Sequence, residues 1–94
     1  MAQRPTAPER RTYLVEHYRP GMRVEELRRS AARVRDMVAR MEQEGEQVEL
    51  VSSTVVPRDE YFLSVLSAAS EQLVREAFAR AQVPFERISI AVEG

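Results

Sequence analysis

The sequence predicts a single α+β domain whose elements follow the order β-α-β-β-α-β. Three observations predict this fold class: a long amphipathic helix, two β-rich runs joined by a short turn after it, and a shorter helix followed by an alternating run at the end. A length of 94 residues fits one domain. A chain this short buries a limited share of its surface, so pairing with a second copy is an easy source of further stability.

The chain is predicted to begin with a tail and a strand. Residues 1–11 contain prolines and charges but little that can be buried, which predicts a flexible N-terminal tail before a folded domain over 12–94. Residues 12–18 are short and rich in β-branched and aromatic side chains, which is typical of a strand. Pro20 and Gly21 mark the turn after it.

A long helix is predicted over 23–44. Its apolar residues recur at spacings of three and four, which places them on one face, and Gly45 is the expected stop. The apolar residues are Val24, Leu27, Ala31, Val34, Val38 and Met41.

A hairpin is predicted next, from strands over 48–56 and 61–67 with a two-residue loop at 58–59. That loop would pair Val55 with Phe62, Ser53 with Ser64, and Val51 with Leu66.

The last two elements are a helix and a strand. Ser70 is a plausible N-cap for a helix that ends before Pro84. Alternation of Ile88, Ile90 and Val92 with smaller or polar residues predicts a half-buried strand.

This order of elements predicts the ferredoxin-like arrangement, a four-stranded antiparallel sheet with both helices on one face. The last strand is expected to turn Ile88, Ile90 and Val92 toward the helices. Both faces of the hairpin carry apolar residues, and Tyr61, Leu63 and Val65 suit the helix side. On the first strand a charge is least tolerated against the helices, so Glu16 is placed on the open side, with Tyr13 and Val15 on the helix side. The open side is then expected to carry Leu14, Glu16, Tyr18, Val51, Ser53, Val55, Phe62, Ser64, Leu66 and Ser89.

An open face of that composition is a large apolar patch, which monomers rarely leave in water. The sequence therefore predicts a homodimer that packs face to face through the open sheet, as in a dimeric α+β barrel. Two copies would enclose a mostly apolar cavity with a small polar centre, which is the usual composition of a ligand site.

Three short segments carry a resemblance to a known family. They are Tyr13-Leu14-Val15-Glu16 before Pro20-Gly21, the hairpin from Ser53 to Leu66, and Val83-Pro84 with Glu86-Arg87-Ile88-Ser89. With them the chain resembles a family of small bacterial ferredoxin-like domains of unknown function, one branch of which is nickel-responsive or nickel-binding. The resemblance implies a dimeric fold, with a metal such as nickel or a small ligand near the sheet face.

The chain departs from that family at two places. Where the family has His-Ser-Tyr-Val on the second strand, this chain has Ser52-Ser53-Thr54-Val55. Where Cys-Val-Tyr is common on the third strand, it has Ser64-Val65-Leu66, so these positions hold no soft or nitrogen donor for a metal.

Glu16 is the first candidate for a functional residue. A carboxylate in a closing apolar cavity has its pKa raised by desolvation, which suits a general base or a cation ligand. The simpler interpretation is a rim carboxylate paired with an arginine of the partner. Ser53, Ser64, Ser89 and Tyr18 are candidates for hydrogen bonds to a bound ligand, or for small polar and aromatic residues that only fill an interface.

His17 is the only histidine and a weaker candidate for a metal ligand. Neighbouring residues of a strand point to opposite faces, so Glu16 and His17 are not expected to hold one ion together. The simpler interpretation is a histidine near the surface at the end of a strand.

The composition excludes several classes of function. The absence of Cys excludes a disulfide framework and a thiolate metal site, and a net charge of −1 disfavours a nucleic-acid-binding domain. No apolar run has the length of a membrane span, and the polar start predicts no secretory signal, so we expect a cytoplasmic protein without membrane partners.

Three functions stay open. The first is a homodimeric domain that binds a small ligand or a cation around Glu16. The second is a cofactor-free enzyme of the monooxygenase or isomerase type, disfavoured by the lack of an organised acid–base pair. The third is a pure dimerisation or interaction module.

Overall fold

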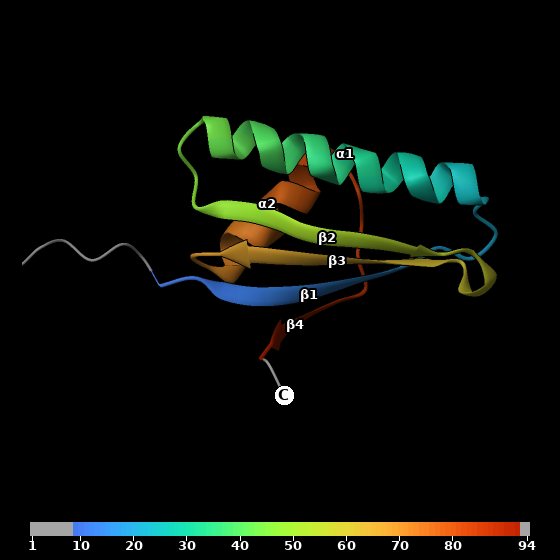
Figure 1. The fold of residues 1–94 in the computed structure, drawn as a ribbon. Helices are drawn as coiled ribbons and strands as arrows, with labels where there is room; N and C mark the ends of the chain where they lie inside the picture. Colours follow the sequence, from blue (N-terminus) through green and yellow to red (C-terminus); the bar gives the residue numbers. More distant parts are fainter. Residues whose placement is uncertain (1–8, 93–94) are drawn as a thin grey trace, which may run out of the picture.

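The computed structural model of the protein describes residues 9–92 and has the predicted order of elements (Figure 1). Most of the predicted tail, residues 1–8, lies outside the described residues. The elements are β1 (Arg11–Tyr18), α1 (Val24–Gln43), β2 (Val48–Val56), the short 3-10 helix η1 (Pro57–Asp59), β3 (Tyr61–Ala68), α2 (Glu71–Ala81) and β4 (Arg87–Ala91). The strands form one antiparallel sheet in the order β2-β3-β1-β4, which confirms the ferredoxin-like fold.

Both helices lie on the same side of the sheet, and the other side is uncovered (Figure 1). The predicted stripe of α1 is buried from Leu27 to Met41 because it packs mainly against β2 and α2. Ser70 caps α2 as predicted, since its hydroxyl oxygen accepts a hydrogen bond from the Leu73 amide at 3.3 Å. Neither helix in this part of the chain combines the length and the apolar character needed to cross a membrane.

One arginine of α1 fastens the two helices together. The Arg33 guanidinium donates a hydrogen bond from Nη2 to the carbonyl oxygen of Ala81 at 3.0 Å and a second from Nε at 3.2 Å. Gln82, which follows α2, adopts a left-handed backbone conformation with φ 57°. The guanidinium therefore satisfies carbonyl groups that the helix end would otherwise leave unpaired.

The covered face of β1 is as predicted, because Tyr13 and Val15 are buried there. The face predicted for β3 is wrong. Phe62 and Leu66 are fully buried under the helices, while Leu63 and Val65 lie on the open face. The cross-strand register decides this, since His17 of β1 stands opposite Phe62 and directly opposed residues share a face.

A β-bulge in β2 changes the predicted hairpin. Val55 pairs with Phe62 and Ser53 with Ser64 as predicted, but the register shifts between Leu50 and Ser52. Leu66 therefore pairs with Leu50 instead of Val51, which bulges out and is 56% exposed. The extra residue resets the alternation, so apolar side chains on both sides of the bulge reach the helix layer. They are Val48, Leu50 and Val55.

β4 has the predicted orientation, with Ile88 and Ile90 on the helix side opposite Val15 and Tyr13. It lies at the edge of the sheet, away from α1 (Figure 1). Ile88 packs against the core, but Ile90 is 53% exposed. The prediction for Val92 is wrong, because Val92 follows the end of β4 and is 88% exposed.

Candidate functional site

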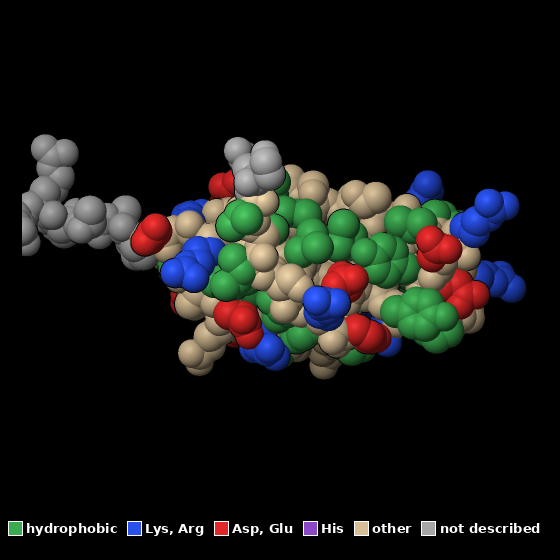
Figure 2. Space-filling model, turned by 90° about the horizontal axis from the view of Figure 1, so that it is seen from below, with side chains coloured by type: hydrophobic (Ala, Val, Ile, Leu, Met, Phe, Trp, Pro, Cys, Tyr) green, Lys and Arg blue, Asp and Glu red, His purple; other side chains and the backbone are tan. Residues whose placement is uncertain are grey.

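The open face of the sheet is formed mainly by the two central strands. β1 and β3 contribute the apolar and aromatic side chains of this face, and β4 adds a charged and a polar residue at one edge. Its residues include Leu14, Glu16, Tyr18, Tyr61, Leu63, Val65, Arg87 and Ser89. Viewed from this side, green apolar side chains run along the length of the sheet, with acidic and basic side chains among them (Figure 2).

Glu16 forms an ion pair on this face. Its partner in the β1–β4 register is Arg87, and the Arg87 Nε atom lies 3.7 Å from Oε2 of Glu16. The two side chains are 32% exposed for Glu16 and 72% exposed for Arg87. Such a pair adds little to stability in water, because solvent screens it and two side chains must be ordered. Arg87 did not stand out in the sequence, since only the register of β4 against β1 brings it to Glu16.

A phenol lies in the field of the same carboxylate. Burial raises the pKa of the Tyr61 phenol, and the carboxylates of Glu16 and Asp59 raise it further. Tyr61 therefore remains protonated at neutral pH and can donate a hydrogen bond from its hydroxyl group.

The structure brings some of the predicted site residues together and separates others. Ser89 lies opposite Leu14 on the open face, and Tyr18, which is 50% exposed, is at the end of β1 on that face. Both share this surface with Glu16. Ser53 and Ser64 face each other on the helix side, because they stand opposite each other in the register that buries Phe62.

His17 is in the core, which corrects the prediction of a surface position. Its side chain is fully buried and stacks on the Phe62 ring, with 3.9 Å between ring centroids and 3° between planes. Its Nδ1 lies 3.1 Å from the carbonyl oxygen of Pro84 and its Nε2 lies 3.4 Å from the hydroxyl of Ser64. Because a carbonyl oxygen only accepts, Nδ1 carries the proton and Nε2 accepts from Ser64.

The environment of His17 keeps the ring neutral. Burial lowers its pKa to about 4; the hydrogen bond to Pro84 opposes that shift, and the charge of Arg19 adds to it. The alternation that buries Tyr13 and Val15 continues to His17, and this was the signal in the sequence for its burial.

The profile of one protein family matches residues 13–90, which include nearly all of the sheet and both helices. The chain belongs to the SCO4226-like family of nickel-responsive proteins. This confirms the resemblance stated from the sequence. No curated protein and no solved structure matches the chain.

The potential metal donors of this SCO4226-like chain are dispersed. Residues 9–92 contain no group of three or more His, Cys, Asp or Glu side chains placed to hold a metal ion. On the open face the donors are oxygen atoms, which include the Glu16 carboxylate, the hydroxyl groups of Tyr18, Tyr61 and Ser89, and the Glu49 carboxylate on the edge strand β2. On the central strands a single chain therefore offers Glu16 as one anchoring charge, and a complete site there would need further donors from a second molecule or a ligand.

Proposed function

We propose that this SCO4226-like chain is a homodimeric binding domain that holds a cation, or a small ligand with a positively charged group, between two open sheet faces at Glu16. The observation that carries the proposal is an ion pair, Glu16 with Arg87, set on an apolar sheet face that no helix covers. An acidic group in that position is a ready partner for a positive charge.

The composition of the open face supports pairing with a second copy. Leu14, Leu63 and Val65 lie on the central strands of that face, so an isolated molecule leaves a contiguous apolar surface in water. A two-fold axis through the middle of the sheet would place β1 and β3 of each copy against the same strands of the other. Such packing would bring the two Glu16 side chains near each other, and the charges of both would lie close to one site.

Arg87 indicates how a positive occupant would enter. Its side chain is mostly exposed, so its attraction to Glu16 is weak in water and easily exchanged. Covering the face with a second sheet lowers the local dielectric and strengthens every remaining charge interaction. A ligand ammonium group or a metal cation can then replace one guanidinium at the carboxylates.

The family description, nickel-responsive, supports a cation as the occupant. The residues of this chain do not fit a nickel site, because nickel in proteins is well served by imidazole nitrogen and the only imidazole, that of His17, has both nitrogens engaged in the core. The oxygen donors of the open face suit harder cations such as Mg²⁺, Ca²⁺ and Mn²⁺.

Catalysis is not part of the proposal. A cofactor-free enzyme would need an acid–base pair at one substrate, and the sheet separates Glu16 from His17.

The test is calorimetric titration of metal-free protein with Mg²⁺, Ca²⁺, Mn²⁺, Ni²⁺ and the diamine putrescine. We expect saturable binding of at least one of them, and at least about tenfold weaker binding by Glu16→Gln, because the charge-assisted contacts to the carboxylate are lost. Glu49→Gln is the matched control, since Glu49 is an exposed carboxylate on the edge strand of the same face. Equal binding by Glu16→Gln and wild type, or no binding of any probe, would contradict the proposal. Either result would favour the alternative function, a module that serves only for dimerisation or interaction.

A further inference from the structure

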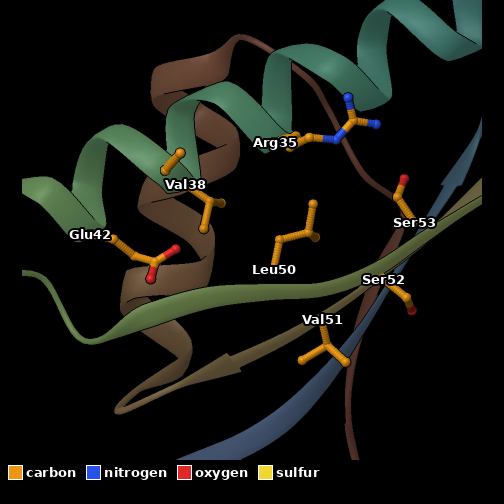
Figure 3. Close-up of a pocket in the computed structure, with 8 residues that line it drawn as sticks. Arg35, Val38, Glu42, Leu50, Val51, Ser52 and Ser53 are labelled. Carbon is orange, nitrogen blue, oxygen red and sulfur yellow. The ribbon is translucent and has the colours of Figure 1, made fainter.

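A groove of about 330 Å³ lies between α1 and β2 (Figure 3), whereas Glu16 lies on the open face of the sheet. That volume is at the lower end of the range for sites that bind small molecules. The groove runs beside the β-bulge, where the register shifts between Leu50 and Ser52. It is therefore a separate feature from the site proposed on the open face.

One end of the groove is suited to an anion. The Arg35 guanidinium has no ion-pair partner among residues 9–92, and it extends toward Ser53 in Figure 3. The hydroxyl oxygen of Ser53 is buried and makes no hydrogen bond within the described chain. Leaving such a group unsatisfied costs about 1–3 kcal/mol, so a bound acceptor is favoured once rotation about the Cα–Cβ bond of Ser53 turns the hydroxyl toward the groove. A carboxylate can accept from the Ser53 hydroxyl and the Arg35 guanidinium together.

The other end is suited to a cation. The Glu42 carboxylate points into the groove and has no ion-pair partner in the described part of the chain. Glu42 also lies in the last turn of α1, where the negative end of the helix dipole disfavours a carboxylate and favours a positive charge. A ligand ammonium group would pair with the Glu42 carboxylate and would also lie at the negative end of the helix dipole.

The floor between the two ends is aliphatic, because Leu50 points from the strand toward the helix and Val38 is buried beside it. Arg35 and Glu42 are two turns of the same helix apart, which is about 10 Å along its axis. A ligand that reaches both ends must therefore be extended.

We propose that this groove binds a linear zwitterion, with its carboxylate at Arg35 and Ser53, its aliphatic chain over Leu50, and its ammonium group at Glu42. The class is that of straight-chain ω-amino acids. A compound that carries only one of the two charges satisfies one end and leaves the other unpaired.

The test is a titration of ¹⁵N-labelled protein with 6-aminohexanoate, hexanoate and hexylamine, followed by amide shifts in NMR spectra. We expect saturable shifts at Leu50 and Ser53 with 6-aminohexanoate, and about tenfold weaker binding of each singly charged compound. Arg35→Gln is expected to weaken binding of 6-aminohexanoate by a similar factor. Arg29→Gln, which removes the same charge from an exposed position of α1 outside the groove, is expected to leave it unchanged.

Several results would overturn the proposal. The absence of saturable shifts would mean that water satisfies Ser53 and that the groove is only a surface feature. Equal weakening by Arg35→Gln and Arg29→Gln would assign any binding to general electrostatics. Shifts centred on Glu16 would place the zwitterion on the open face instead.

Discussion

Glu16 and His17 are neighbours in β1, yet they lie in opposite environments. His17 points under the helices, where burial keeps its ring neutral and both nitrogens have partners. Glu16 points to the uncovered face and pairs with an arginine that remains mostly in water. The comparison teaches that the helix layer decides which face of the sheet forms the core and which face leaves charged groups in contact with water.

The largest effect is expected from truncating neighbouring residues on the two faces of β3. Phe62→Ala removes a fully buried ring that stacks on His17 and is expected to lower the free energy of unfolding by about 3–5 kcal/mol. Leu63→Ala removes a half-buried side chain from the open face and should cost about 1 kcal/mol. Urea unfolding of both variants at one protein concentration makes the comparison. A larger loss in Leu63→Ala, in samples of both variants that light scattering shows to be single chains, would reverse the assignment of the faces.

The second effect is a dependence of the free energy of unfolding on pH, and it comes from a residue of the covered face. Because burial lowers the pKa of His17 to about 4 from its ordinary 6.5, the unfolded chain binds a proton before the folded chain does as the pH falls. The stability linked to His17 is therefore fully present above pH 6.5 and is lost as the pH falls toward 4, by up to about 3 kcal/mol.

Urea unfolding of wild type and His17→Gln between pH 4 and 7.5 measures this effect. Carboxylates that titrate in the same range contribute equally to both proteins, so the difference between the two curves isolates the histidine. Parallel curves would contradict a buried, neutral His17.

The third effect tests how the helix layer is held over the sheet. Arg33→Ala removes the hydrogen bonds from α1 to the carbonyl of Ala81, and is expected to lower the free energy of unfolding by about 1–2 kcal/mol. Thermal unfolding by circular dichroism gives the shift. Arg29→Ala, which removes the same side chain from an exposed position of α1, is the control and should shift the curve little. An equal shift in the two variants would show that Arg33 does not join the helices.

The smallest effect is expected for the ion pair of the open face. Arg87→Ala should change the free energy of unfolding by less than about 1 kcal/mol, because Arg87 is largely exposed. The same variant should bind a cationic probe at Glu16 more tightly, since its internal competitor is gone. A large loss of stability would mean that the pair is structural and not available for exchange.

Much of the fold could be predicted because periodicity reports it directly. The stripe of α1, the cap at Ser70 and the orientation of β4 each follow from local patterns that the structure confirms. β3 has apolar residues on both faces, so alternation alone does not decide which face is covered. The register against β1 decides it, and register is a long-range property that one strand does not specify.

The site was harder to predict for the same reason. Glu16 was assigned to the open face because a charge is least tolerated under the helices, and that assignment holds. Ser53 and Ser64 followed the wrong face of β3, and His17 was judged by its place near the end of a strand instead of by its alternation with Val15. Ser53 lies in one groove with Arg35 and Glu42 because the bulge resets the alternation of β2 and turns Ser53 to the helix side.

The most direct test of the central claim, that the open face pairs two copies, is the mass of the metal-free protein by light scattering on a gel-filtration column, repeated with added nickel. The account predicts about twice the 10.8 kDa of one chain in both runs. It also predicts a shift toward the mass of one chain in Leu63→Glu, but not in Gln72→Glu, which adds the same charge at an exposed position of α2. A single-chain mass in both runs, or a dimer that forms only with nickel, would contradict it.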